Sequence, residues 1–210
     1  GAMSRTSIDA GKLRDRLQVL ELTEAPAGTW SWQSVRAARG QVELSTSDRR
    51  SNLFSSVGIG ARGAEVLLRR QALSLHSALR WGEQHLFLTS IVPEGRLHLR
   101  LQTALVEPVT CLAVRTEDTV GEGGRPKAAE TLRLTFPGVL TEKYARYERE
   151  ETHAENETSY VLVTPKVIQL RSGDLVTVQE GPAKGVYHVA VCHVLDAWKN
   201  EYEIVWRGDV

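Results

Sequence analysis

The sequence predicts a mainly β protein built from two small antiparallel β-barrel or sandwich modules in tandem, with long projecting loops. Segments in which apolar and polar residues alternate recur along the chain, and such alternation is typical of strands with one buried face. Short runs that contain Pro and Gly separate these segments and predict turns. The series of strand-like segments in the first half also returns in the second half, which predicts two copies of one module.

The repeat is clearest in two hairpin-like segment pairs, and it extends upstream through shorter matches. Because the match lies in order and pattern more than in identical residues, chance similarity between β-hairpins remains the alternative to duplication. The corresponding segments are 85–91 and 188–194, 97–101 and 202–206, 65–68 and 160–163, and 73–75 and 168–170.

The bulk composition narrows the functional classes. The 26 basic and 26 acidic residues cancel, so the chain lacks the excess positive charge with which a dedicated nucleic-acid-binding protein contacts phosphates. Two cysteines, Cys111 and Cys192, make no disulfide framework and fit a reducing compartment, with a single disulfide between them as the alternative. No stretch approaches the ~20 apolar residues of a membrane span, so we expect no membrane partner.

The first module is predicted to span residues 4–115. Trp30 and Trp32 are predicted to anchor a small core, since one aromatic side chain buries ~150–250 Å². The alternating leucines of 97–101 are predicted to share one buried strand face. The expected elements are a turn and strand within 8–22, a turn at 25–28, strands at 30–44, 64–70, 85–92 and 96–105, a short strand or turn at 73–80, and a hairpin turn at 93–95.

Residues 45–63 differ in character from the strands around them, because they are rich in Ser, Gly and Arg and carry few apolar side chains. Loops longer than ~12–15 residues are usually functional or disordered. We therefore predict a loop that projects from the module and binds a partner chain, with a surface loop without a role as the alternative. The predicted partner-binding residues are Arg49, Arg50, Leu53, Phe54, Val57, Ile59 and Arg62.

A linker is predicted at residues 116–130, which are polar, contain Gly and Pro, and lack apolar periodicity. The second module is then predicted over 131–210 and opens with a strand that breaks at Pro137 and Gly138. The Glu-rich run at 141–158 predicts either a solvated helix or a second projecting loop. Further strands are expected at 160–170, 174–179, 186–195 and 201–207.

The first half of the chain resembles the tailed-phage head–tail joining proteins, also called head-closure or stopper proteins. The Gly-Lys-Leu-Arg-Asp-Arg run at 11–16 is similar to the segment that leads into the first strand of that family. Trp30 and the strand at 35–37 continue the similarity, although Arg36 stands where the family favours Trp. The resemblance then passes through 65–70, 81–91 and 97–101, and it covers residues 8–108.

This resemblance implies a non-enzymatic virion structural protein. Such a protein is a small β-barrel that self-associates into a ring, links the portal side to the tail, and helps retain packaged DNA. Its expected partners are portal or adaptor proteins, tail proteins, and packaged DNA through non-specific contacts. The expected location is the virion, or the host cytoplasm during assembly. Family members usually have one module, so the second module departs from the pattern. The alternative function is a tandem β-barrel interaction module that binds a peptide or a tail component.

The sequence predicts no enzyme, no metal site and no cofactor. His188 and His193 lie five residues apart on a predicted strand, so they are not expected to converge as zinc ligands. The Gly-rich run at 58–63 lacks the preceding apolar strand of a dinucleotide site. Asp174 and Asp196 show no sequence sign of a buried carboxylate pair suited to acid–base chemistry.

Overall fold

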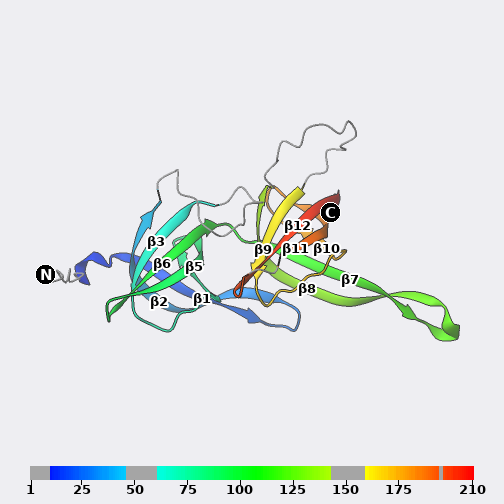
Figure 1. Ribbon diagram of the computed structural model, residues 1–210, viewed down its shortest axis with the longest axis horizontal. Coiled ribbons are helices and arrows are strands. Elements are labelled where there is room, and N and C mark those ends of the chain that lie inside the picture. The colour runs from blue at the N-terminus through cyan, green and yellow to red at the C-terminus, as the bar shows by residue number, and fades with distance from the viewer. Residues whose placement is uncertain (1–9, 46–60, 143–158, 194–195) are drawn as a thin grey trace, which may run out of the picture. The chain divides into compact units, whose positions relative to one another are not determined.

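The computed structural model describes residues 10–45, 61–142, 159–193 and 196–210 (Figure 1). It confirms the predicted fold class, because the described chain forms two closed six-stranded antiparallel barrels in tandem. In the first barrel the strands neighbour one another in the order β1-β2-β3-β6-β5-β4. These strands are β1 (Asp15–Glu24), β2 (Trp30–Leu44), β3 (Gly63–Arg69), β4 (Ser77–Trp81), β5 (Gln84–Glu94) and β6 (His98–Val106).

The second barrel has the same topology as the first. Its strand order, β7-β8-β9-β12-β11-β10 around the closed sheet, is the order of the first barrel continued along the chain. The predicted repeat segments therefore fall on corresponding strands, with β3 matching β9, β5 matching β11, and β6 matching β12. The strands are β7 (Val109–Val120), β8 (Pro126–Glu142), β9 (Ser159–Pro165), β10 (Leu175–Val178), β11 (Gly185–His193) and β12 (Lys199–Gly208).

The hairpin formed by β1 and β2 contributes to both compact units of the chain. Its outer part, Leu22–Gln33, belongs to the second unit together with Glu107–Val210. Within that unit Thr29 forms a parallel bridge with Thr135 of β8, and the Thr135 amide donates a 2.8 Å hydrogen bond to the Gly28 carbonyl. Trp30 packs against the core of the second barrel, and not against the core of its own module as the sequence suggested.

Residues 116–130 correct the linker prediction. They form the end of β7, the short 3-10 turn Glu122–Gly124, and the start of β8. Backbone pairs from Thr116–Glu130 to Val120–Pro126 join the two strands into a ribbon, which we call the distal ribbon. Its polarity and its lack of apolar periodicity arise because both faces of the ribbon are exposed, and not because the backbone is unpaired.

Pro137 and Gly138 do not break the strand as expected, because both lie within β8. Gly138 is buried, and a Cβ at this position would lie 2.7 Å from Leu162 Cδ1 and 3.0 Å from the Cys111 sulfur. The glycine therefore allows close packing in the barrel interior and is not part of a turn.

Two apolar segments outside the strands complete the two cores at matching places. Leu73 and Leu75, just before β4, pack against the first core, and Ile168 and Leu170, before β10, belong to the second. Residues 166–170 lie beyond the end of β9, so the predicted strand at 160–170 is too long. No helix in the described parts of the chain is long and apolar enough to cross a membrane.

Candidate functional site: an arginine-lined pocket in the first barrel

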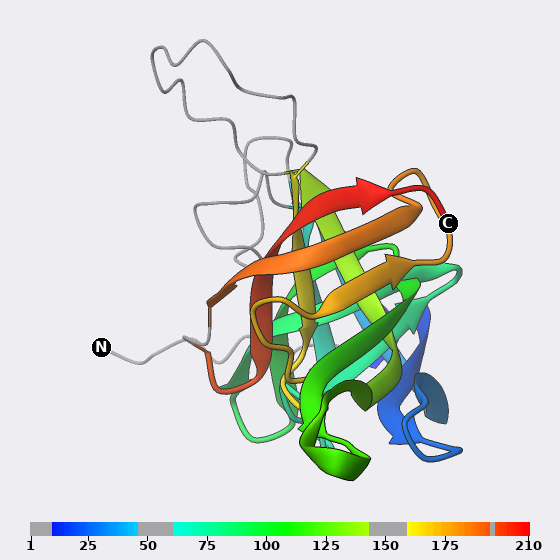
Figure 2. The same cartoon turned by 90° about the vertical axis from the view of Figure 1, so that its right-hand side faces the viewer.

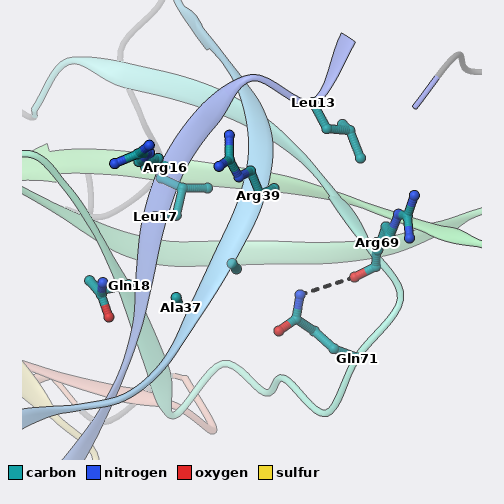
Figure 3. A pocket seen from close by; sticks show the side chains of 9 residues that line it. Leu13, Arg16, Leu17, Gln18, Ala37, Arg39, Arg69 and Gln71 are labelled. Atoms are coloured by element: carbon teal, nitrogen blue, oxygen red, sulfur yellow. Dashed lines mark hydrogen bonds between the residues drawn. The ribbon is translucent and has the colours of Figure 1, made fainter. Parts of the chain in front are cut away.

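A pocket of about 790 Å³ opens on the first barrel beside β1, β2 and the end of β3 (Figure 3). We call it the arginine pocket. Its apolar lining consists of Leu13, Leu17, Ala37 and Ala38. Its polar lining consists of Arg16, Gln18, Arg39, Arg69 and Gln71.

The pocket forms where β2 is no longer paired with β3. Pairing between these strands covers Gly40–Leu44 only, so the part of β2 before Gly40 has a free outer edge on this side. Gly40 permits tight packing at the branch point, since a Cβ there would lie 2.8 Å from the Leu67 carbonyl oxygen.

Hydrogen bonds hold the segment after β3 beside β2. The Arg36 Nε group donates to Gln71 Oε1 at 2.9 Å, and the Arg36 guanidinium also donates to the Ala72 carbonyl. Gln71 Nε2 in turn donates to the Arg69 carbonyl at 3.1 Å, as the dashed line in Figure 3 shows. These bonds fix the position of Gln71 in the pocket lining.

The arginine pocket presents groups that bind anions. Arg16, Arg39 and Arg69 are exposed and contribute three positive charges, and the described lining residues include no carboxylate. Guanidinium groups bind carboxylates and phosphates through paired hydrogen bonds. The lining also offers no thiol, hydroxyl, imidazole or carboxylate to act as a nucleophile or general base. The arrangement suits an anionic group attached to an apolar surface.

The sequence pattern does not predict this pocket. Of the predicted partner-binding residues, Arg49, Arg50, Leu53, Phe54, Val57 and Ile59 lie outside the described residues. Arg62 is exposed just before β3, and its carbonyl accepts a 2.8 Å hydrogen bond from the Leu105 amide. Because Arg69 lies at the opposite end of β3, the structure does not bring Arg62 into the pocket. The sequence features that could have indicated the pocket are the arginine-containing run at 11–16 and Arg36.

The second barrel contains a buried ion pair between Arg115 and Asp174 that the sequence pattern does not predict. Asp174 has a side chain only 2% exposed and accepts two 2.8 Å hydrogen bonds from the Arg115 guanidinium. The Arg171 amide donates a third bond to the same carboxylate at 2.8 Å. This pairing raises the pKa of Arg115. Three hydrogen bonds therefore fix the position of this carboxylate between Arg115 and the Arg171 backbone.

The histidines of the described segments are dispersed across the two barrels. His193 contacts Glu203 at 2.8 Å, whereas His85 is buried in the first barrel. No cluster of three or more metal-ligating side chains occurs among the described residues. Burial, and secondarily the charge of Arg80, lowers the pKa of His85 to about 4.

We expect His85 to make the protein less stable as the pH falls from about 6.5 to about 4. The unfolded chain protonates this histidine near its ordinary pKa of 6.5, whereas the folded chain resists protonation down to about 4. Between these values the unfolded state binds more protons, so the free energy of unfolding falls by on the order of 3 kcal/mol across the window. Urea unfolding at pH 7.5 and pH 4.5 measures this loss.

The matched variants are His85→Gln, which removes the buried imidazole, and His76→Gln, which changes an exposed one. We expect the difference in stability between the two pH values to shrink in His85→Gln and to persist in His76→Gln. An unchanged pH dependence in His85→Gln would contradict the assignment.

Cys111 is a buried core residue, and burial, assisted by the negative charge of Glu180, raises the pKa of its thiol to about 12. Both Cys111 and Cys192 are free thiols in the structure. Since only the thiolate is strongly nucleophilic, we expect iodoacetamide at pH 8 to leave Cys111 unmodified in the folded protein and to alkylate it fully in urea. Peptide mass spectrometry of the Cys192→Ser variant isolates this thiol, and rapid alkylation under native conditions would refute the expectation.

Comparison with protein-family models, with curated proteins and with solved structures gives no match.

Proposed function

We propose that this chain is a non-enzymatic structural protein of the head–tail connector of a tailed phage or prophage. In this function it links the portal or adaptor side to the tail, self-associates in a ring, and helps retain packaged DNA. The observation that carries the proposal is the resemblance over residues 8–108. The closed first barrel supports it, since Asp15–Glu24 to His98–Val106 supply the small β-barrel that the resemblance implies.

Several properties of the chain agree with a structural role. Because the formal charge of the chain is zero, its copies do not strongly repel one another. The described lining of the arginine pocket carries cationic groups that bind anions. Arg62, which is exposed beside β3, is proposed with Arg49 and Arg50 to contact DNA phosphates without sequence specificity.

The test of the proposal is the composition and infectivity of virions. A strain lacking the gene should produce filled or emptied heads without attached tails, and complementation with the full chain should restore infectious particles. Peptide mass spectrometry of purified wild-type virions should detect the chain. Its absence from virions, together with normal infectivity of the deletion strain, would overturn the proposal.

The segment 45–63 has its own test. The Ser45 amide donates a 2.9 Å hydrogen bond to the Gly63 carbonyl, so the two chain ends that flank the segment are close enough for a short Gly-Ser bridge. Replacement of residues 46–60 by that bridge should leave a folded barrel by circular dichroism and abolish infectivity. A matched control replaces exposed Arg96 and Leu97 by serine and should keep infectivity. Normal virions from the bridged variant would refute the role of the segment.

The alternative proposal is a tandem β-barrel module that binds a peptide or a tail component. The arginine pocket favours this function, because it combines three cationic side chains with an apolar lining. Virion composition distinguishes the two proposals: a connector protein is present in every particle, whereas a module that acts outside the particle is missing from it.

A further inference from the structure

The second barrel contains a filled binding position for a β-hairpin arm. The outer edge of β8 pairs with β9 only from Val139 onwards. Before that point, Thr29 of the segment Leu22–Gln33 bridges Thr135, and Trp30 packs against the adjoining core. Gly28 suits this contact, because its φ is +78° and a Cβ would lie 3.0 Å from the Arg133 carbonyl oxygen. An arm of the β1–β2 hairpin thus adds to the free edge of β8.

The arginine pocket is the corresponding position of the first barrel. Gly40 in β2 and Gly138 in β8 occupy similar places, since each is buried near the point where pairing with the next strand begins, and each lies close to a leucine of that strand, Leu68 or Leu162. Thr135, which carries the arm, lies three residues before Gly138. The residue three before Gly40 is Ala37, which lines the arginine pocket. The edge of β8 in the second barrel is therefore covered by Thr29, whereas the similar stretch of β2 in the first barrel lines the arginine pocket.

The distal ribbon corresponds to the arm that fills the second barrel. In the shared topology the β7–β8 hairpin occupies the place of the β1–β2 hairpin. The ribbon extends from the body of its barrel (Figures 1 and 2), and its side chains at 116–120 and 126–128 are exposed. Val120, close to its tip, is 84% exposed. The second module therefore presents an arm whose apolar tip residue is uncovered.

Charge complementarity relates the ribbon to the pocket. The distal ribbon contains four acidic residues, Glu117, Asp118, Glu122 and Glu130. Glu117 pairs with Arg171 and Glu130 with Arg133 within the chain, so Asp118 and Glu122 are the acidic side chains that we expect to meet a pocket of another copy. The pocket presents Arg16, Arg39 and Arg69. Asp118 and Glu122 are complementary in charge to these three arginines.

We propose that the arginine pocket binds the distal ribbon of a second copy of this chain. The ribbon backbone adds to the free edge of β2 near Ala37, as Thr29 adds to β8 at Thr135, and its acidic side chains meet the pocket arginines. Each chain carries one ribbon and one pocket, so the contact is heterologous and repeats from copy to copy until it closes into a ring or continues as a filament. The biological meaning of a closed ring rests on the proposed connector function, whereas the contact itself can be measured on the purified chain.

The experiment uses the full-length chain and sedimentation velocity over a range of concentrations. One variant reverses the pocket charge (Arg39→Glu with Arg69→Glu), and another reverses the ribbon charge (Asp118→Lys with Glu122→Lys). All four changed residues are exposed, and circular dichroism confirms folding. We expect the wild type to self-associate and each variant alone to weaken association by about tenfold or more. Arg96→Glu, an exposed change at the β5–β6 turn, is the matched control and should associate as the wild type does.

The most discriminating measurement uses a mixture of the pocket variant and the ribbon variant. The pocket variant keeps a working ribbon, the ribbon variant keeps a working pocket, and the two reversed surfaces are complementary to each other. An equimolar mixture should therefore recover the association that each variant alone has lost. A chain with all four reversals should self-associate again, because its charges are complementary in the opposite sense. The inference is overturned if the wild type stays monomeric, or if its association is insensitive to both charge reversals. It is also overturned if a cross-link between ribbon and pocket forms only within one chain. None of these outcomes removes the chain from virions, so the connector proposal is judged separately.

Discussion

Asp174→Ala is expected to destabilise the second barrel by about 3–5 kcal/mol. The substitution removes a carboxylate that accepts bonds from the Arg115 guanidinium and from the Arg171 amide, all at 2.8 Å. Arg115 is only 15% exposed, so its charge would lose its partner while water replaces that partner poorly. A backbone donor would be left unpaired in addition. Urea unfolding followed by circular dichroism at pH 7 measures the loss.

Glu117→Gln provides the matched control for this prediction. Glu117 pairs with Arg171 at 3.5 Å, and both side chains are more than half exposed. Exposed pairs contribute little, so the control should lose less than about 1 kcal/mol. If the two variants prove equally stable, the buried pair does not hold the barrel together as the geometry indicates.

Leu101→Ala is expected to destabilise the first barrel by about 2–5 kcal/mol. Leu101 is completely buried and lies opposite Val66 of β3 and Ile91 of β5. Truncation removes apolar contacts and leaves a cavity that a closed barrel can fill only in part, because its strands are held by hydrogen bonds on both sides. The same urea titration at pH 7 measures the effect.

Leu97→Ala is the matched control, since it makes the same change four residues earlier. Leu97 is 71% exposed and precedes the first residue of β6. Its truncation should change the free energy of unfolding by less than about 0.5 kcal/mol. Equal losses at the two positions would contradict the assignment of Leu101 to the core.

These two leucines also show how far alternation predicts a barrel. The alternating pattern of 97–101 indicates a strand with one buried face, and Leu99 and Leu101 are indeed buried. Leu97 shares the pattern but lies in the turn before β6, where no neighbouring strand covers it. Alternation reports which side of a strand a residue faces, but the end of the strand depends on pairing with a distant segment.

The repeat was predictable at the level of strand order and less so at the level of single residues. The match of 65–68 with 160–163 pairs Val66 with Val161. In the structure Val66 and Leu68 of β3 belong to the first core cluster. In β9, the corresponding strand of the second barrel, the buried residue of the core cluster is Leu162. A shift of one residue reverses the face of every side chain in a strand, so pattern similarity alone does not determine the register.

The arginine pocket could not be predicted from spacing. Arg16, Arg39 and Arg69 come from β1, β2 and the end of β3, and they share a pocket only because the barrel closes with a particular register. Asp174 is a similar case, because its partner Arg115 lies on β7, far away in the sequence. By contrast, the polar composition of 116–130 reflects exposure correctly, and the error lay in equating exposure with a linker.

Closure of both sheets has a consequence for strand pairing with other chains. A barrel joins its first strand to its last, which hides most of the amide and carbonyl groups through which open sheets join other chains and aggregate. The distal ribbon is different, since a two-stranded ribbon keeps two such edges exposed along its length. The charged side chains of Glu117, Asp118 and Lys127 on this ribbon disfavour indiscriminate strand pairing along these edges.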